Sequence, residues 1–222
     1  MAGPAPLRLA HRGDFRFAPE NSLAAFAAAL ANPACDGLEF DVRMSVDGVP
    51  VINHDDTLRR VHGRPERVDR LTASELGALG VPTLGEVLEL AGHGPFLDVE
   101  LKGDPGPAAL DVVLAGRGPA LERAVVSSFD PRALERVAGL RPAWARWLNS
   151  HVLDRATIAD ALALGCRGVA VDWRALDARS VGPALAAGLE VASYTVRRRP
   201  TFDRLARLGV MAVCVEAAAL DG

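Results

Sequence analysis

The stretch GVAVDWRALDARSVGPALAAGLEVASYTV, residues 168–196, decides the fold of this chain. Its two ends, Gly168–Val171 and Glu190–Val196, are short valine-rich runs of the kind found in buried strands. Between them, Ser180–Ala187 has the alanine and leucine content of a helix. A strand, a helix and a second strand in this order predict two parallel strands joined by a right-handed crossover.

The same alternation extends over the rest of the chain. We expect further strands at Leu7–Ala10, Gly37–Val42, Phe96–Leu101, Ala124–Ser128, Ala143–Leu148 and Val210–Val215, and a short extended segment, Val49–Asn53, after the Asp47-Gly48 turn. We expect further helices at Ser22–Ala31, Thr72–Leu79, Thr83–Ala91, Ala108–Ala115, Arg132–Ala138, Arg155–Leu164 and Phe202–Leu208. Eight main strands, each but the last followed by a helix, predict an α/β protein with a (β/α)8 TIM-like barrel as a single domain over residues 1–222. An open doubly wound sheet is the alternative, and the lack of a glycine-rich loop after the first strand weighs against it.

The composition argues against several classes of protein. The net charge of −3 over 222 residues gives no basic field of the kind that nucleic-acid binders use. We find no signal peptide and no run of roughly 18 apolar residues that would predict a transmembrane helix. The three cysteines, Cys35, Cys166 and Cys214, have neither zinc-site nor disulfide spacing. We therefore expect a cytoplasmic protein that neither binds nucleic acid nor inserts stably into a membrane.

Arginine supplies all but one of the 25 basic residues, and the exception is Lys102. Together with the abundance of alanine, this bias suggests a G+C-rich, bacterial genome. Arginine and lysine are not interchangeable where a compact ammonium group is needed. We therefore expect a functional role for Lys102, with a chance survivor as the alternative.

Acidic side chains end two of the predicted strands. Glu39 and Asp41 are two residues apart, so their side chains point to the same face of one strand. In a barrel, the carboxyl ends of the strands form the active-site mouth, where Glu100 of the next strand would join them. Three carboxylates repel one another unless a cation binds, and oxygen ligands favour Mg²⁺ or Ca²⁺. The alternative is that these acids pair with arginines around the mouth.

Two histidines, His11 and His54, follow extended segments beside these acids. Imidazole has a pKa near neutrality and can act as a base or as an acid, the two roles that cleavage of a phosphodiester needs. Asp55 could orient His54, but we slightly favour a loop role for it. We expect the remaining histidines to be ordinary surface residues: His62, His93 and His151.

Basic side chains are predicted at the same mouth. Arg12 and Lys102 each follow a strand, and both could hold a phosphate and stabilise charge during its transfer. The alternative for Lys102 is an ion pair on the barrel rim.

Three further residues are weaker candidates. Glu20 and Asn21 precede the first helix, where Asn21 or Ser22 is the expected N-cap, and a second role in orienting a catalytic group is possible. Tyr194 ends the seventh strand, where an aromatic ring can shape a pocket for an alcohol or merely pack.

The sequence resembles the glycerophosphodiester phosphodiesterase family, part of the phospholipase C-like phosphodiesterase superfamily. Several stretches carry the resemblance in the family's order and spacing: Ala10-His11-Arg12-Gly13, Pro19-Glu20-Asn21-Ser22, Glu39-Phe40-Asp41-Val42, Asp47-Gly48-Val49-Pro50-Val51, His54-Asp55-Asp56-Thr57-Leu58, Pro82-Thr83-Leu84 and Glu100-Leu101-Lys102. The resemblance is dense over residues 7–102 and thinner afterwards. It implies a TIM-like barrel and a metal-dependent enzyme of lipid metabolism.

The resemblance also implies roles for individual residues. His11 and His54 would act as general base and acid, Glu39, Asp41 and Glu100 would hold one divalent cation, and Arg12 and Lys102 would engage the phosphate. The implied reaction converts a small-molecule glycerophosphodiester and water to glycerol 3-phosphate and an alcohol. Attack by a glycerol hydroxyl, which gives a cyclic phosphate, and direct attack by water both stay open.

The chain departs from the family at three places. The family has an inserted region after the second histidine. The corresponding segment here, residues 59–81, is shorter, so the insertion is reduced. Tyr194 stands where tryptophan is usual, and Val215-Glu216 stands where Thr-Asp is usual. None of these removes a predicted catalytic group.

Two other functions compete with this interpretation. The first keeps the barrel but cleaves a lysophospholipid or another lipid phosphodiester, which would need a route for the lipid chain. The second is a catalytically silent barrel that binds a phosphorylated metabolite, which the intact histidines and acids disfavour. The head group, the native ion and the oligomeric state are left open.

Overall fold

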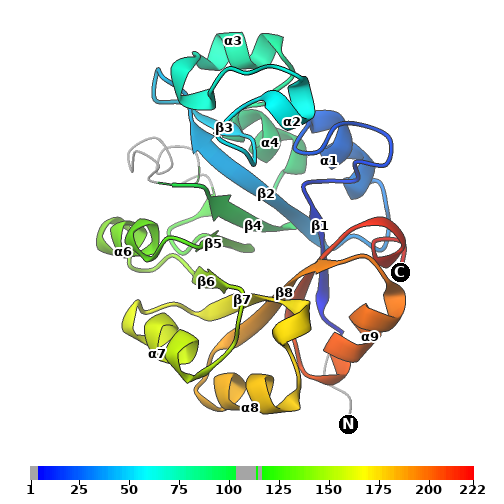
Figure 1. Cartoon of the computed structure of the whole chain (residues 1–222), viewed down its shortest axis with the longest axis vertical. Coiled ribbons are helices and arrows are strands. Elements are labelled where there is room, and N and C mark those ends of the chain that lie inside the picture. The colour runs from blue at the N-terminus through cyan, green and yellow to red at the C-terminus, as the bar shows by residue number, and fades with distance from the viewer. Residues whose placement is uncertain (1–4, 104–113, 115–116) are drawn as a thin grey trace.

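The computed structural model describes residues 5–103, 114 and 117–222, and these form a closed barrel of eight parallel strands. Neighbours in the chain are neighbours in the ring, and β9 pairs with β1 to close it (Figure 1). The barrel strands are β1 (Leu7–His11), β2 (Gly37–Met44), β4 (Phe96–Leu101), β5 (Ala124–Ser128), β6 (Arg146–Ser150), β7 (Gly168–Asp172), β8 (Glu190–Val196) and β9 (Ala212–Val215). The predicted (β/α)8 architecture is confirmed.

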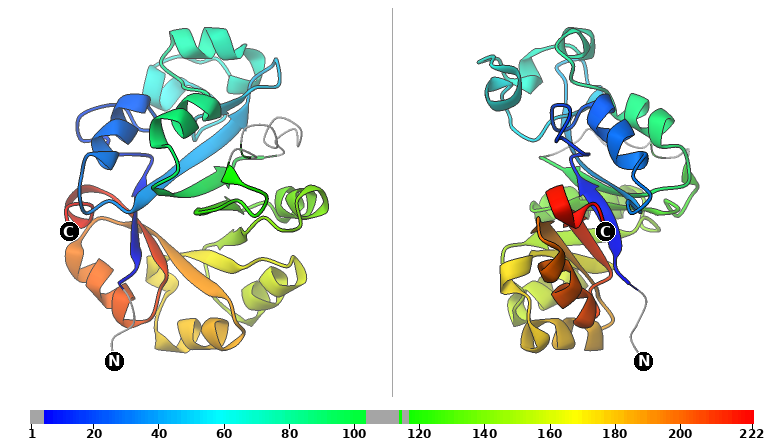
Figure 2. Two further views of the ribbon diagram at one scale, coloured as in Figure 1. Left: turned by 180° about the vertical axis from the view of Figure 1, so that it is seen from behind. Right: turned by 90° about the vertical axis from the view of Figure 1, so that its right-hand side faces the viewer.

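The longer helices cover the outside of the ring, as Figures 1 and 2 show. They are α1 (Leu23–Leu30), α4 (Leu84–Ala91), α6 (Pro131–Leu140), α7 (Arg155–Ala163), α8 (Ala178–Ala186) and α9 (Arg199–Arg207). Their apolar faces pack on the strands, as where the Phe26 ring of α1 meets that of Phe40 on β2, with 5.8 Å between ring centroids. The helix predicted at Ala108–Ala115 lies outside the described residues except at Leu114, which is buried. In the part of the chain that the structure describes, we find no helix with the length and apolarity that crossing a membrane requires.

A small lobe stands beside β2 (Figure 2). After the predicted turn, β3 (Pro50–Ile52) pairs with β2 in the antiparallel direction. The chain then forms α2 (Arg59–His62), the 3-10 turn η1 (Val68–Arg70) and α3 (Ala73–Ala78). The lobe has its own apolar cluster, separate from that of the barrel: Val51, Leu58, Val68, Leu76 and Val81.

The inside of the barrel changes from apolar to polar along each strand. One apolar cluster fills the interior with residues that include Leu9, Phe96, Val125, Trp147, Ala192 and Cys214. Side chains on a strand return to the same face every second residue. Two residues beyond those just named, the same strands present His11, Asp98, Ser127, Asn149 and Tyr194, and the chain after β9 presents Glu216. The pleat of each strand therefore delivers polar groups to one end of the barrel.

Several element boundaries differ from the prediction. Strand β6 was expected at Ala143–Leu148, but its first ladder pair joins Val126 to Arg146. The backbone N–H of Trp144 instead donates to Arg141 O at 3.0 Å, which makes a turn before the strand. Helix α9 begins at Arg199, earlier than expected, because Pro200 fits the first turn of a helix.

Candidate active site at the barrel mouth

A cavity of about 290 Å³ opens at the carboxyl ends of the strands. Both predicted histidines line it, together with two of the predicted acids and both predicted cations: His11, His54, Glu39, Glu100, Arg12 and Lys102. Its opposite wall carries Phe129, Asn149, His151, Tyr194 and Thr195. The structure thus brings groups from distant parts of the sequence around one space.

The three predicted metal ligands converge at this cavity. Glu39, Asp41 and Glu100 each offer an oxygen within 4.8 Å of the others. Their side by side placement follows from the sheet register, which pairs Asp41 of β2 with Glu100 of β4. All three are buried, with exposed fractions of 3%, 0% and 9% respectively. A compact group of buried carboxylates is the donor set that a hard divalent cation takes.

Glu39 differs from Asp41 in its pKa and in its hydrogen bonding. Burial, followed by repulsion from Asp41 and Glu100, raises the pKa of Glu39 well above its usual value. Its Oε1 atom has no hydrogen-bond partner within the described ranges. A buried carboxylate oxygen without a partner is costly unless a cation or a proton satisfies it. The residues present therefore fit a divalent cation.

Asp41 is the acid that pairs with an arginine, as the alternative predicted, and it also pairs with Lys102. Its Oδ2 lies 3.0 Å from Arg12 Nε and its Oδ1 lies 3.2 Å from Lys102 Nζ. Asn21 Nδ2 also donates to Asp41 at 2.8 Å. Burial acts to raise the pKa of Asp41, but Arg12 and Lys102 outweigh it, so the pKa is lowered. Lys102 bridges to Glu100 as well, and despite burial these two acids raise the pKa of the lysine.

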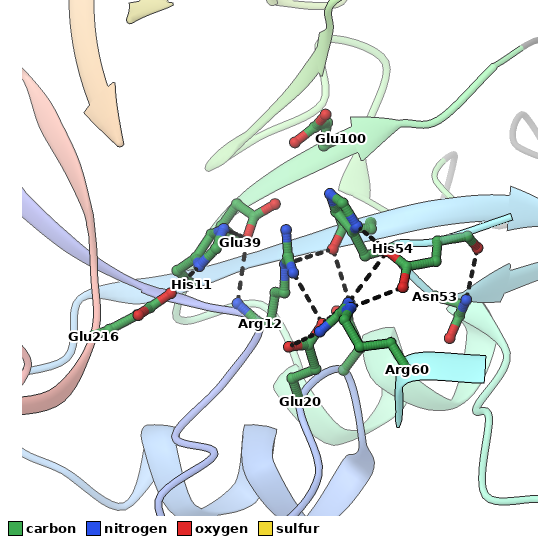
Figure 3. A network of polar contacts seen from close by, with 12 residues as sticks. His11, Arg12, Glu20, Glu39, Asn53, His54, Arg60, Glu100 and Glu216 are labelled. Atoms are coloured by element: carbon green, nitrogen blue, oxygen red, sulfur yellow. Dashed lines mark hydrogen bonds and ion pairs between the residues drawn. The ribbon is translucent and has the colours of Figure 1, made fainter. Parts of the chain in front are cut away.

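His11 is held by a residue that the sequence did not single out for function. Glu216, just after β9, accepts a hydrogen bond from His11 Nδ1 at 2.6 Å (Figure 3). Arg197 Nε in turn pairs with Glu216 at 2.6 Å. The other ring nitrogen, Nε2, lies 3.8 Å from Glu39 Oε2. A carboxylate at the end of the last strand was a usable signal, but it was read only as a departure from the family pattern.

His54 is fixed in a similar way from the lobe side. Asp55 lies in a bend, as expected, and it also accepts a hydrogen bond from His54 Nδ1 at 2.6 Å, the contact that the alternative predicted. Arg60 donates to Asp55 at 2.7 Å, and the pKa of Asp55 falls to about 2, because these partners outweigh the opposing effect of burial. Burial lowers the pKa of His54, although Asp41 and Asp55 oppose it.

The backbone around His54 is also tied to the barrel. Arg43 of β2 donates to the carbonyl oxygen of His54 from Nε at 2.9 Å and from Nη2 at 2.7 Å. Its Nη1 reaches the carbonyl oxygen of Lys102 at 3.4 Å. Asn53 adds a bond from its Nδ2 to Asp55 O at 2.7 Å. His54 thus lies on a short segment, residues 53–55, which we call the strap and which β2 holds in place through Arg43.

Glu20 and Asn21 support the site from beneath. Glu20 accepts bonds from Arg12 at 2.9 Å and from Arg60 at 2.7 Å (Figure 3). It therefore links Arg12, which follows His11, to Arg60, which bonds to the partner of His54. Asn21 does not cap α1, because Ser22 accepts the bond from Ala25 N at 3.2 Å. Both Arg12 and Asn21 have left-handed backbones, with φ of 60° and 57°. This conformation is rare for arginine and commoner for asparagine, and strained backbones of this kind cluster at functional sites.

Aromatic groups form the wall opposite the acids. The Tyr194 hydroxyl donates to Ser150 O at 2.7 Å, and burial raises the pKa of this phenol. The Phe129 ring lies 5.0 Å from the His151 ring and 5.8 Å from that of Tyr194, measured between centroids. His151 read as an ordinary surface residue; it is exposed, but it also lines the cavity.

Comparison with known proteins gives a consistent result. Residues 11–220 match the sequence model of the glycerophosphoryl diester phosphodiesterase family. A glycerophosphodiester phosphodiesterase of Caldanaerobacter subterraneus subsp. tengcongensis is 34% identical over 61% of this chain and 63% of its own length. Glycerophosphodiester phosphodiesterase 1 of Mus musculus is 33% identical over 58% of this chain and 44% of its own length. These matched regions thus span less than two thirds of either relative.

Solved structures match over nearly the whole chain. An Oleispira antarctica phosphodiesterase, solved with its product sn-glycerol-3-phosphate, is 30% identical with a TM-score of 0.85 and covers 95% of this chain and 93% of its own. A glycerophosphodiester phosphodiesterase of Agrobacterium tumefaciens is 25% identical with a TM-score of 0.83, over 97% and 98% of the two chains.

Proposed function

We propose, from the premise that this chain belongs to the glycerophosphoryl diester phosphodiesterase family, that it hydrolyses glycerophosphodiesters to glycerol 3-phosphate and an alcohol. The observation that carries the proposal is the convergence of two imidazoles, two cations and two predicted acids on one cavity, with a third acid, Asp41, offering an oxygen within 4.8 Å of those two. The Oleispira relative, whose structure holds sn-glycerol-3-phosphate, supports the identity of the product.

We propose Mg²⁺ or Ca²⁺ as the ion held by Glu39, Asp41 and Glu100. One support is the buried oxygen of Glu39, which has no hydrogen-bond partner among the described residues. The other is the raised pKa values of Glu39 and Glu100, each caused first by burial and then by the neighbouring carboxylates. When bound, such an ion supplies positive charge that stabilises the phosphate oxygens as they gain charge.

The cationic side chains would orient the phosphate. Arg12 is anchored to Glu20 and Asp41, and Lys102 is anchored to Asp41 and Glu100. These anchors fix both charges before the substrate binds, so less ordering is needed on binding.

The two histidines would move protons on either side of the phosphorus. His11 Nδ1 donates to Glu216, so its Nε2 is free to take a proton from the attacking hydroxyl. His54 would give a proton to the leaving alcohol oxygen as the phosphorus–oxygen bond breaks. Its lowered pKa, which burial causes, favours release of that proton. The attacking group can be water, or a glycerol hydroxyl followed by water on the cyclic phosphate.

A substrate panel tests the function. Purified protein is offered glycerophosphocholine, glycerophosphoethanolamine, glycerophosphoglycerol and a lysophospholipid, each with Mg²⁺, Ca²⁺ or EDTA. Turnover of the first three that EDTA abolishes is expected. Turnover of the lysophospholipid alone would support the lipid alternative, and no turnover with any ion would support the silent barrel.

The histidine roles are tested by substitution. His11→Ala and His54→Ala should each lower kcat by roughly 10²–10⁴, the usual contribution of a general acid or base. His93→Ala is the matched control, since His93 is exposed and is not among the described residues that line the cavity. A near-wild-type rate in either catalytic variant would remove that residue from the mechanism.

We further propose that the protein works in the turnover of lipid head groups in the bacterial cytoplasm. The cysteines support a reducing compartment, because all three are free and none is paired among the described residues. Fractionation of the native organism with an antibody to this chain would test the location.

A further inference from the structure

A second hollow, which we call the arginine groove, lies directly beside the reaction cavity. It has a volume of about 490 Å³ and is formed where β7 and β8 end and α9 begins. Trp173, Arg174, Arg197 and Arg198 line it. Tyr194 and Thr195 line both this groove and the reaction cavity, so a single ligand can extend from one into the other.

The charge of the groove is positive. Its acidic lining residue, Asp172, lies 3.2 Å from Arg174 and is neutralised by it. Arg197 is paired with Glu216, the carboxylate that holds His11. Arg198 has no ion-pair partner within residues 5–103, 114 and 117–222. The groove thus has one guanidinium, that of Arg198, whose charge no acid among the described residues balances. The guanidinium groups of Arg174 and Arg197 can also contact a ligand there.

Part of the groove is ordered before any ligand binds. The Arg174 guanidinium stacks 4.7 Å from the centre of the Trp173 ring. Arg204 of α9 lies 5.8 Å from the centre of the same ring and donates to the carbonyl oxygens of Leu176 and Trp173 at 2.6 and 2.9 Å. Stacked, hydrogen-bonded groups lose less freedom when they bind a ligand.

This arrangement suits a phosphate and disfavours a cation. A guanidinium offers parallel N–H donors that match two phosphate oxygens, and a dianion can be shared between neighbouring arginines. A choline or ethanolamine group would meet excess charge of its own sign. We propose that the arginine groove is a subsite for a phosphate monoester, held mainly by Arg198 and Arg174.

The phosphate monoester has two possible sources. It can be a second phosphate on the diester that is being cleaved, or a separate phosphomonoester such as the product. This inference rests on the proposed function, because it places the group beside a phosphodiester in the reaction cavity.

The test uses two substrates that differ by one phosphate: glycerophosphoglycerol and glycerophosphoglycerol with a terminal phosphate. We expect kcat/KM to be higher for the phosphorylated substrate. Arg198→Gln should reduce this preference about three- to tenfold, which is the range for one exposed, charge-assisted hydrogen bond. Arg198→Glu should reduce it further. Arg199→Gln is the matched control, because Arg199 is the next residue, is exposed and is not among the described lining residues.

Inhibition by inorganic phosphate separates the two sources. If free phosphate is the ligand, the inhibition constant should rise in Arg198→Gln and stay unchanged in Arg199→Gln, whichever substrate is used. If the second phosphate belongs to the substrate, only the substrate preference should respond to Arg198. The proposal is overturned if neither quantity depends on Arg198 while both diesters are hydrolysed. Absence of any hydrolysis would instead count against the proposed function.

Discussion

Replacement of Glu216 by glutamine probes the positioning of His11. The substitution keeps the size of the side chain but removes the charge that accepts a hydrogen bond from His11 Nδ1 at 2.6 Å. A hydrogen bond to a charged group contributes about 1.5–3 kcal/mol, and here Glu216 is only 7% exposed, so water would replace it poorly. Since each 1.4 kcal/mol corresponds to a factor of ten, kcat should fall roughly 10- to 150-fold.

Steady-state kinetics on glycerophosphoglycerol would measure this effect, with thermal denaturation run in parallel. The fall should appear in kcat with little change in KM, since Glu216 acts through His11 and is not among the described lining residues of the reaction cavity. Glu190→Gln is the matched control. Glu190 also accepts charge-assisted bonds, from Arg167 at 2.8 Å and from Trp147 at 3.0 Å, but it lies at the amino end of β8, away from the mouth.

Two results would contradict this reasoning. A folded Glu216→Gln protein with a kcat within twofold of wild type would show that His11 does not need the carboxylate. An equal loss in Glu190→Gln would show that any carboxylate with charge-assisted bonds of this kind matters, whatever its position.

Three further outcomes are expected. Arg43→Gln should lower kcat roughly tenfold at similar KM, because the strap that carries His54 loses its bonds to β2; an unchanged kcat would rule this out. Asp55→Asn should move the alkaline limb of the kcat/KM profile to lower pH, because the bond to Asp55 raises the pKa of His54 and the protonated acid would be lost earlier; a shift to higher pH would contradict its role as the acid. In EDTA, the melting temperature should fall as the pH rises above the usual range of a glutamate, because burial raises the folded-state pKa of Glu39 above its unfolded value, so stability is lost as the group ionises. Glu39→Gln should flatten that fall, and an equal slope in calorimetry would argue against it.

The sequence predicted the barrel because its signals are local and repeated. Valine-rich runs and alanine-rich helices recur through the chain, and only parallel strands satisfy that order. It also predicted which acids would meet, since the two-residue period of a strand and the shared carboxyl end of neighbouring strands fix where Glu39, Asp41 and Glu100 point.

The residues that orient the histidines could not be predicted in the same way. The bond between His11 and Glu216 joins positions 205 residues apart, and it exists only because the ring closes between β9 and β1. Asp55 is adjacent to His54, but the sequence does not show which way its carboxylate turns. His151 was misjudged because the expected strand ended at Leu148, whereas β6 runs on to Ser150 and carries the histidine to the mouth.

The small lobe beside β2 has a consequence for how such enzymes diversify. His11 is rooted in the barrel wall, whereas His54 sits where the barrel meets a lobe with an apolar cluster of its own. Because that cluster is separate, substitutions or insertions in α2 and α3 can change the surroundings of His54 while the ring of strands is left intact. Evolution can then vary substrate choice in a segment whose alteration leaves the folding of the scaffold untouched.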